Sequence, residues 1–569
     1  MIPIIAKESF PVSTDKNALL AGRPNFPAGE FAVLARTEGD LAAWGRLFAT
    51  HGASGVKDVA GDFAVGLTDA NGRTILAVDR FAVRSLCYRV EGGRIHFASR
   101  ADELADAHTE IDAQAIYDYL YFHVIPSPRT IFKNIYRLPP GHYAVFENGQ
   151  LRLGRYWTAD FQEEKKASFD QLRTEFRHLL ADGVRRQLDG SKPACFLSGG
   201  TDSSTVAGMI GLVSGQAAAT YSIGFDAEGY DEMEYARIAA RHFHTDHHEY
   251  YVTPADLVRS IPDVARFYDQ PFGNSSALPA YYCAKMAQED GVTRILAGDG
   301  GDELFGGNTR YAKQKVFGFY DQLPSALRNT LLEPLLLESP LGKLPLFSKG
   351  ASYIRQAKVP LPDRTQTYNL LFRFGVHDVF TAGFLEGVDL AEPVAQQRTV
   401  WAETGSTAQT NKELAFDWRY TLAECDLPKV VGTTTLAGID VGFPMLDADL
   451  LAFSMRLPTE YKLKGLKLRW FFKEALRGFL PDEILTKKKQ GFGLPFGVWV
   501  TQNNELRNLA ENSVRALAER KIFKSEFVDQ IFMHLREHPG YYGEMIWISI
   551  MLEQWLRGHD QKLSGRNSS

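Results

Sequence analysis

The chain has 569 residues, more than one domain usually holds, so its length predicts two large domains or three smaller ones. An apolar share of 45%, a charged share of 23% and a formal net charge of −6 are typical of a soluble protein with mixed surface charge. Nothing in this balance indicates nucleic acid or a membrane as a partner. The opening residues, interrupted by Lys7, lack a secretory signal, and no apolar run is long enough to cross a bilayer, so we expect a cytoplasmic protein.

Residues 1–160 predict an antiparallel, β-rich domain. Strand-like runs such as "EFAVLAR", "GDFAVGLTDANGRTILAVDRF" and "GHYAVFENGQLRLGRYW" alternate with glycine turns that are typical of hairpins. A helical patch, "DAQAIYDYLYF", interrupts the strands.

Residues 165–560 predict an α/β domain, because strand, loop and helix patterns alternate from Ala167 onward. This alternation indicates a parallel sheet flanked by helices, followed beyond Asn308 by a mainly helical extension. Polar loops that follow parallel strands gather at one edge of a sheet, where ligands bind. We expect the tail, residues 561–569, to be disordered.

The stretch "PACFLSGGTDSSTVAGMIGLV" carries the strongest chemical signal. A short buried strand, Ala194 to Leu197, leads into a glycine turn and a helix that opens near Asp202. Glycines let the backbone approach a ligand, while serine hydroxyls and the free N–H groups of a helix start favour phosphate. The pattern lacks the G-K-[ST] of a Walker loop, so it predicts a grip on pyrophosphate rather than transfer of a γ-phosphate.

A second polar loop, "GDGGDELFGG", follows the strand-like "RILA" and carries Asp299, Asp302 and Glu303. A carboxylate such as Asp202 beside phosphates needs a divalent ion between them, and a second carboxylate would complete the ion's site. Alone, this acidic turn is equally typical of a solvated surface loop. Two such loops at one sheet edge favour a shared cleft.

These motifs resemble those of the asparagine synthetase family, whose synthetase domain carries S-G-G-x-D-S and G-[DE]-G-x-D-E loops. The resemblance runs from about Gly61 to Leu494 and includes "VDRFAVRSLCY", "IFKNIYRLPPGHYAVF", "YSIGFDAEGYDEMEYA", "YDQPFGNSSALP" and "TKKKQGFGLP". It implies a degenerate Ntn-type glutaminase domain, an α+β sandwich, followed by a pyrophosphate-loop synthetase domain with a parallel sheet.

The resemblance also implies an AMP-forming amide ligase that uses ATP and Mg²⁺. A carboxylate is adenylated, pyrophosphate leaves, and an amine or ammonia displaces AMP. Residue by residue, it assigns the phosphates to Ser198, Gly199, Gly200, Asp202 and Ser203, Mg²⁺ to Asp202 and Asp302, and the adenosine pocket to Leu197, Ile223, Ala297 and Gly298. Lys489 would stabilise charge on the α-phosphate, Lys429 would contact a phosphate, and Asp299 would orient the amine or accept its proton.

The chain departs from the family at the amino terminus. Glutamine-dependent members have a cysteine directly after the initiator methionine, whereas Met1 is followed here by Ile2 and Pro3. The R-G-P-D and N-G-E-I-Y-N patterns are also missing, so we expect no glutaminase activity and a domain that serves as a structural lid or docking surface. The four cysteines, Cys87, Cys195, Cys283 and Cys425, are widely spaced and predict buried thiols in a reducing compartment.

A second departure is "KVVGTTTLAGIDVGFP", where the family has K-V-D-R-x-S-M and E-x-R-V-P. Val431, Gly432, Asp440 and Gly442 therefore replace charged partners that we expect near the acceptor site. Altered acceptor regions without glutaminase are also found in lasso-peptide cyclases and β-lactam synthetases, which close rings. This departure favours ring closure on a small or peptide precursor, whereas Asp299 favours ammonia-dependent asparagine synthesis.

Functions outside amide ligation are less compatible with these residues. A catalytically silent scaffold is disfavoured because charged loop residues are costly to retain without a ligand. Adenylation of RNA or sulfate lacks the expected basic patch or nearby cysteine. The run His242–His248 fits no standard metal-ligand spacing, so we favour a structural role for it. A homodimer, or a partner that processes a precursor peptide, is compatible with the sequence.

Overall fold

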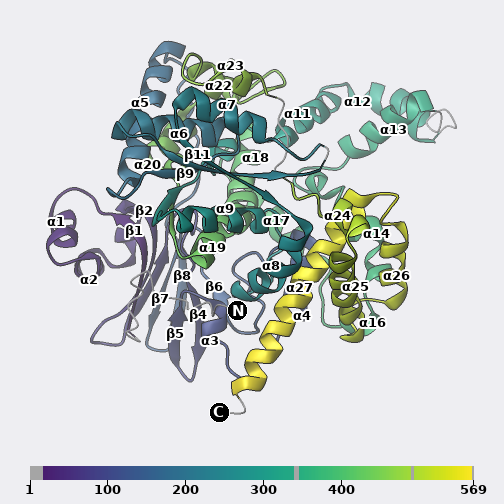
Figure 1. Ribbon diagram of the computed structural model, residues 1–569, viewed down its shortest axis with the longest axis horizontal. Coiled ribbons are helices and arrows are strands. Elements are labelled where there is room, and N and C mark those ends of the chain that lie inside the picture. The colour runs from purple at the N-terminus through teal and green to yellow at the C-terminus, as the bar shows by residue number, and fades with distance from the viewer. Residues whose placement is uncertain (1–16, 228, 339–344, 488–492, 567–569) are drawn as a thin grey trace.

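The computed structural model in Figure 1 describes residues 17–227, 229–338, 345–487 and 493–566. Its amino-terminal part is β-rich, as predicted, with one sheet of order β1–β2–β3–β7–β8 and a smaller one of order β5–β4–β6, both antiparallel. The strands are β1 Ala18–Asn25, β2 Ala60–Thr68, β3 Thr74–Val78, β4 Cys87–Glu91, β5 Arg94–Ala98, β6 Tyr136–Arg137, β7 His142–Glu147 and β8 Gln150–Arg155. The helices are α1 Glu30–Thr37, α2 Asp40–His51, the 3-10 turn Gly52–Asp58, α3 Ala101–Leu104 and α4 Ala113–Phe122.

The strand predicted for "EFAVLAR" is wrong, because these residues form α1. Phe31, Leu34 and Ala35 are spaced three and four apart, and in a helix this spacing turns them toward one apolar cluster under the sheet. Helical periodicity and strand-like composition compete in so short a run, and packing against the cluster decides the outcome.

The second domain is built on a five-stranded sheet of order β11–β10–β9–β12–β13, in which every neighbouring pair is parallel. The strands are β9 Ala194–Phe196, β10 Ala219–Phe225, β11 Asp246–Val252, β12 Arg294–Leu296 and β13 Asp440–Gly442. The chain starts in the middle, at β9, and adds later strands first on one side and then on the other. The strand order therefore reverses beside β9, which is where open parallel sheets leave a ligand crevice.

Helices cover both faces of this sheet. In Figure 1, α5, α6 and α7 lie on one face, while α8, α9 and α19 lie on the face toward the amino-terminal domain. Their bounds are α5 Phe169–Gln187, α6 Thr201–Ser214, α7 Met233–Phe243, α8 Pro254–Phe267, α9 Ala277–Glu289, α10 Gly301–Phe305 and α19 Leu427–Ala437.

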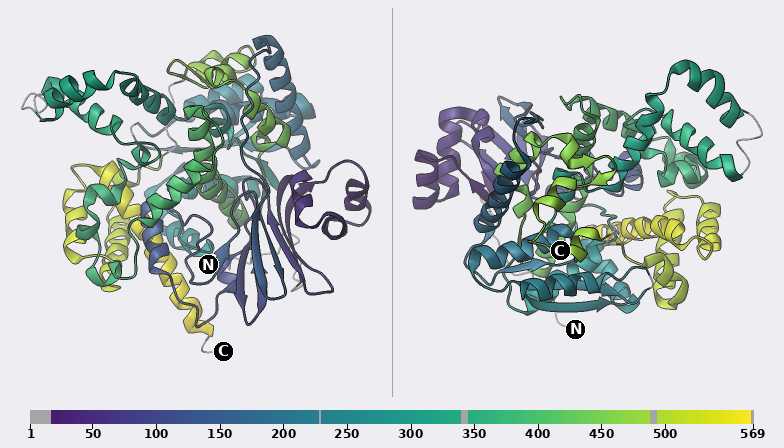
Figure 2. Two further views of the ribbon diagram at one scale, coloured as in Figure 1. Left: turned by 180° about the vertical axis from the view of Figure 1, so that it is seen from behind. Right: turned by 90° about the horizontal axis from the view of Figure 1, so that it is seen from above.

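The remainder is mainly helical, as predicted. A helical arm projects from the body, as both views in Figure 2 show. It contains α11 Thr309–Asp321, α12 Ser325–Leu327, the π-helical segments Arg328–Leu332 and Pro334–Glu338, and α13 Pro345–Ala357. The elements that follow are α14 Leu370–Phe374, α15 Val376–Val379, α16 Ala382–Leu385, α17 Glu392–Ala402, α18 Gln409–Asp417, the π-helical Trp418–Asp426, α20 Ala448–Arg456, α21 Thr459–Lys462, β14 Leu463–Lys464, β15 Lys467–Leu468, α22 Trp470–Ala475, α23 Asp482–Thr486, α24 Phe496–Gln502, α25 Asn504–Glu519, α26 Ser525–His534 and α27 Pro539–Arg566.

Residues 561–566 of the tail for which we predict disorder belong to α27, which continues to Arg566. Packing explains the length of this helix: its middle turns are fully buried, and Trp547 and Trp555 donate hydrogen bonds to the carbonyls of Gly273 and Tyr268. Residues 567–569 lie outside the described part of the chain.

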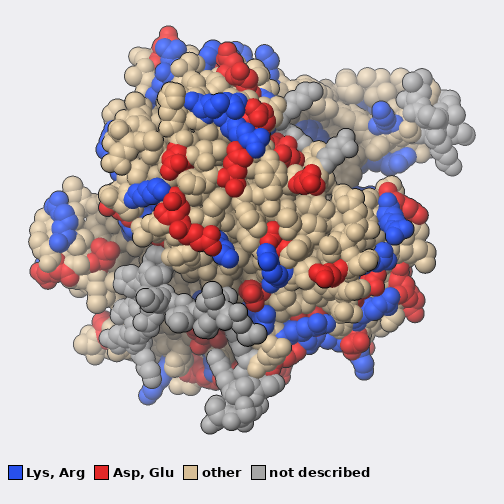
Figure 3. All heavy atoms as spheres, viewed as in Figure 1, with Lys and Arg blue, Asp and Glu red and all other residues tan. Residues whose placement is uncertain are grey.

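The two domains share one core. The largest apolar cluster includes Tyr119 and Phe132 of the first domain together with Phe176 and Ile548 of the second. Among the described residues, no helix is both long enough and apolar enough to span a bilayer. On the face shown in Figure 3, basic and acidic side chains are interspersed.

Candidate active site

A cleft of about 920 Å³ opens at the carboxyl ends of β9, β10 and β12. Its walls include residues from the loop after β9 and from the loop after β12, so the two polar loops predicted to share a cleft do so. The volume lies at the upper end of the range for small-molecule sites, roughly 300 to 1,000 Å³. The cleft can therefore hold a nucleotide together with a second molecule.

The loop after β9 turns tightly into α6, which begins at Thr201. The Ser203 hydroxyl accepts a hydrogen bond from the Ser198 amide at 3.1 Å and lies 3.1 Å from the Ser198 hydroxyl. Gly199 adopts a φ of +67°, and a Cβ at this position would collide with the backbone of Tyr235 and Ala236. The conformation thus requires glycine, and the first residues of α6, Thr201 to Ser203, line the cleft at the end of a helix that favours an anion.

The carboxylates of Asp202 and Asp302 converge on one guanidinium group. Arg469 Nη1 lies 2.8 Å from Asp202 Oδ2 and 2.6 Å from Asp302 Oδ1, and Arg469 Nη2 also pairs with Asp202. Arg469 precedes α22, and its side chain is only 5% exposed. Two oxygens that share one nitrogen at these distances form a donor set that a single divalent cation could also bridge.

Two glycines of the second loop make room for these carboxylates. A Cβ at Gly301 would overlap the Asp202 carboxylate, and a Cβ at Gly307 would overlap both the Asp302 carboxylate and the Arg469 side chain. The glycine-rich turn of the sequence therefore has a specific steric purpose, which is the close approach of the two loops.

The cleft wall also carries a group of acidic side chains around Lys429. Lys429 Nζ lies 3.1 Å from Asp426 Oδ1 and 3.4 Å from Asp299 Oδ1. Burial raises the pKa of the Asp299 carboxyl, and Lys429 counteracts this only in part. Burial lowers the pKa of Lys429, but Asp426 and Asp299 outweigh it, so the pKa is raised overall and the side chain stays cationic. Glu303 also lines the cleft.

Most of the residues assigned from the sequence meet in this cleft. Those that line it are Leu197, Ser198, Gly200, Asp202, Ser203, Ile223, Gly298, Asp299, Asp302 and Lys429. Gly199 and Ala297 instead lie behind the wall: Ala297 is fully buried, and Gly199 packs on the start of α7. Lys489 lies outside the described residues.

None of Val431, Gly432, Asp440 and Gly442, which we expected near the acceptor site, lines the cleft, and the expectation is wrong for Asp440. Asp440 pairs in register with Arg294, the first residue of β12, which places it at the opposite end of the sheet from the polar loops. A Cβ at Gly432 would meet the Tyr268 ring, and one at Gly442 would meet the Arg294 side chain, so both glycines serve packing.

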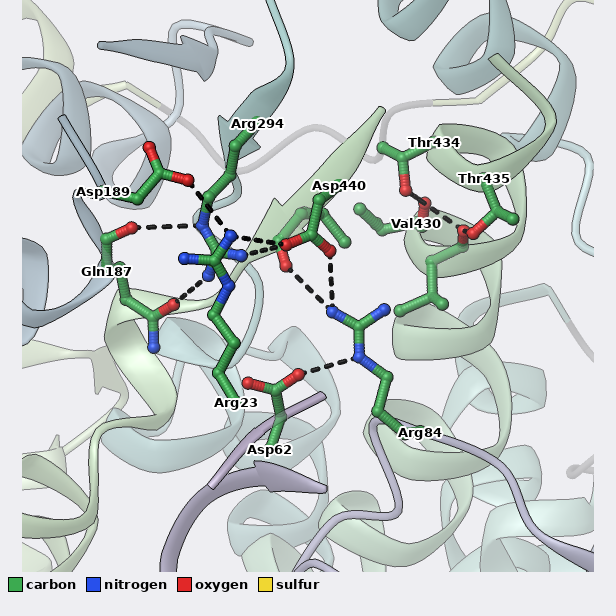
Figure 4. Close-up of polar contacts among 12 residues, drawn as sticks. Arg23, Asp62, Arg84, Gln187, Asp189, Arg294, Val430, Thr434, Thr435 and Asp440 are labelled. Atoms are coloured by element: carbon green, nitrogen blue, oxygen red, sulfur yellow. Dashed lines mark hydrogen bonds and ion pairs between the residues drawn. The ribbon is translucent and has the colours of Figure 1, made fainter. Parts of the chain in front are cut away.

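Asp440 joins the two domains, as Figure 4 shows. Its carboxylate pairs with Arg294, with Arg84 at 2.8 Å and with Arg23 at 3.4 Å, and Arg84 also binds Asp62 at 2.8 Å. Burial would raise the pKa of Asp440, but Arg84 and Arg294 lower it overall, so the carboxyl stays ionised.

Sequence reasoning missed Arg469 and Asp426. Arg469 lies 267 positions from Asp202, and the basic run around it is typical of a solvated surface. Asp426 belongs to a π-helical stretch, whose register no simple periodicity reveals. The sequence around each residue does not indicate a role in the site, because only the fold brings them to the cleft.

None of the histidines of the run His242–His248 lines the cleft. Asp246, His248 and Asp290 are close enough to share a metal ion, but Lys192 and the Tyr221 hydroxyl both donate to Asp290 Oδ2. An ammonium group on this oxygen competes with any cation. We therefore keep a structural role for the cluster as a prediction.

Comparison with known proteins decides the family. The asparagine synthase family model matches residues 175–557, and a glutamine amidotransferase domain model matches residues 31–157. The chain belongs to the asparagine synthase family. It is a ligase that forms carbon–nitrogen bonds, and the sequence-based assignment is confirmed.

Relatives resemble the chain over most of its length. Asparagine synthetase [glutamine-hydrolyzing] 1 of Bacillus subtilis is 24% identical over 483 residues, which cover 84% of this chain and 74% of the relative. Asparagine synthetase [glutamine-hydrolyzing] 3 of the same organism is 26% identical, covering 77% and 68%. Amidase chry2 of Gibberella zeae is 22% identical, covering 83% and 75%.

Proposed function

We propose that the protein adenylates a carboxylate with ATP and then joins it to an amine that this chain does not obtain from glutamine. The observation that carries the proposal is the meeting of the two polar loops, at the point of strand-order reversal, around the convergent carboxylates of Asp202 and Asp302. Such a site suits a polyphosphate that needs a cation, and the family's ligases use ATP.

In the proposed first step, a substrate carboxylate oxygen bonds to the α-phosphorus of ATP, and the bond to the pyrophosphate oxygen breaks. Ser198, Gly200 and Ser203 would hold the β- and γ-phosphates through hydroxyl and amide donors. Asp202 and Asp302 would hold Mg²⁺, which supplies charge neutralisation for the phosphates. Leu197, Ile223 and Gly298 would form the adenosine wall, with Gly199 and Ala297 shaping it from behind.

In the proposed second step, the amine nitrogen attacks the acyl carbon, AMP leaves with the electron pair, and the nitrogen loses a proton. Asp299 lines the cleft beside Lys429, so it would orient the amine and accept that proton. Lys429 stays cationic beside it and would balance the charge or contact a phosphate. By resemblance, Lys489 would stabilise charge on the α-phosphate in both steps.

Four observations bear on the source of the amine. Cys87 is the one cysteine of the first domain, and it is fully buried with the pKa of its thiol raised by burial, so it is unsuited to attack glutamine. Asp440 lies at the end of β13 away from the cleft, which weakens the argument for ring closure. Asp299 does border the cleft, which favours ammonia or another free amine; the large cleft volume keeps ring closure on a precursor as the second candidate.

The test is release of pyrophosphate and AMP from MgATP by the purified protein. Its arms are aspartate with ammonium, aspartate with glutamine, and a panel of carboxylates that carry their own amine. Asp202→Ala should abolish turnover, and Asp170→Ala, an exposed surface carboxylate 77% open to solvent, is the matched control.

Turnover with aspartate and ammonium but not with glutamine would identify an ammonia-dependent synthetase. Turnover with a self-contained precursor alone would identify ring closure. Turnover with glutamine as the nitrogen donor, or silence in every arm with no ATP binding, would contradict the proposal; the latter is the outcome expected of a scaffold.

A further inference from the structure

Arg469 is held tightly at the centre of the proposed phosphate site. Besides Asp202 and Asp302, its Nη1 reaches the Thr201 hydroxyl at 2.8 Å, and its guanidinium lies 4.1 Å from the centre of the Phe472 ring. Its backbone adopts a φ of +53°, a conformation that non-glycine residues rarely take. Strained backbone of this kind persists where the surroundings enforce it, and it is concentrated at functional sites.

The position of the guanidinium conflicts with a metal at the same place. Both carboxylates point their oxygens at Arg469 Nη1, within 2.8 Å. A divalent cation on these oxygens would therefore meet a like charge at hydrogen-bond distance, which is strongly repulsive in a site so little exposed to water. Arg469 and the cation cannot share both carboxylates in this geometry.

The surroundings give the displaced guanidinium one suitable destination. Its Nε is buried and makes no hydrogen bond to any described residue, so the group is not fully satisfied where it lies. Arg469 borders the cleft, as does Lys473 one helical turn further along α22. Phosphate oxygens in the cleft would accept two parallel hydrogen bonds from a guanidinium, the pairing for which arginine is best suited.

We propose that Arg469 is a displaceable cation: it bridges Asp202 and Asp302 until a divalent metal takes these carboxylates, and it then binds the pyrophosphate group. This inference rests on the proposed function and names a new positioning residue within it. One consequence is thermodynamic. Metal alone must expel the arginine without compensation, whereas metal with pyrophosphate provides the arginine with a new partner, so the two ligands bind cooperatively.

The experiment measures Mn²⁺ binding, by electron paramagnetic resonance, to the nucleotide-free full chain with and without inorganic pyrophosphate. In the wild-type protein we expect pyrophosphate to tighten Mn²⁺ binding at least about tenfold, beyond the binding of Mn²⁺ to free pyrophosphate. In Arg469→Gln we expect Mn²⁺ alone to bind about tenfold tighter or better, and the coupling to fall several-fold. Arg241→Gln, a surface arginine paired with Glu234, is the matched control and should behave as wild type.

Equal or weaker binding of Mn²⁺ alone to Arg469→Gln would overturn the proposal, because a merely structural arginine would not compete with the metal. If that variant fails to fold, Arg469→Lys and the wild type decide. The lysine keeps the positive charge but cannot donate two parallel hydrogen bonds to a phosphate. Mn²⁺ affinity should therefore stay within about threefold of the wild type, while coupling to pyrophosphate falls. Absence of coupling in the wild type would also refute it. These measurements need no turnover. A failure of this proposal can therefore be distinguished from a failure of the proposed ligase reaction.

Discussion

Replacing Lys462 with methionine offers a quantitative test of the electrostatics beneath the active site. Lys462 ends α21 and is fully buried. It lies directly against Gly306 of the second polar loop, the one that carries Asp299 and Asp302. Its Nζ donates to Asn411 Oδ1 at 3.0 Å and lies 4.8 Å from the Phe161 ring centre. Burial lowers its pKa to about 7, and Glu163 only partly offsets this.

The sign of the pH effect follows from proton counting. In the unfolded chain the lysine keeps its ordinary pKa of about 10.4 and stays protonated, whereas the folded protein releases the proton near pH 7. The unfolded state therefore binds more protons between these values, and stability rises with pH. One pKa unit corresponds to about 1.4 kcal/mol, so the wild type should gain about 2 kcal/mol relative to Lys462→Met between pH 7 and pH 9.

The assay is urea unfolding of the wild type and Lys462→Met at pH 7, 8 and 9, comparing the difference in free energy of unfolding at each pH. Lys165→Met, which removes an exposed lysine, is the matched control and should show no such trend. A difference between wild type and Lys462→Met that stays constant, or that falls with pH, would refute the reasoning about this buried amine.

Two further substitutions test the domain junction and the phosphate loop. Asp440→Asn leaves Arg294 buried without its anion, so the free energy of unfolding should fall by about 3 to 5 kcal/mol at pH 7. Because the pKa of Asp440 is lowered on folding, the effect should shrink as the pH drops below about 4, and a constant difference in urea titrations would contradict it. Gly199→Ala should slow pyrophosphate release at least about 10²-fold by displacing the loop. Gly215→Ala has a similar φ of +68° but open space around its Cβ, and equal losses in both variants would show that strain alone is responsible.

The sequence predicted those features that short segments encode. Ser198 to Ser203 follow a buried strand and open a helix, so the phosphate loop was readable without the fold. Asp302 was recognisable because its loop also follows a strand. The site's remaining charges, Arg469 and Asp426, were not predictable, since the elements that carry them are short and irregular and reach the cleft only through tertiary packing.

The misplacement of Asp440 has the same origin. Motif alignment put it beside the acceptor, but alignment does not tell which end of a parallel strand a residue occupies. In β13, three residues long, Asp440 and Gly442 lie at opposite ends of one short strand, and the residue that pairs with Arg294 faces the other domain. If a residue is assigned a position only a few places along such a strand from its true one, it is placed at the ligand edge of the sheet instead of at the domain junction.

The domain junction explains why the amino-terminal domain is an integral part of this ligase whether or not it acts on glutamine. Arg84 and Asp62 complete the charge pairing around Asp440, and Phe81 and Val83, which precede Arg84, belong to the same apolar core as Phe176 and Val430 of the second domain. Removing the domain would leave Asp440 and Arg294 beside water with part of their network missing and would expose core side chains. Because β12 continues directly into the loop that carries Asp299 and Asp302, the same junction fixes the strand from which the acidic loop is positioned.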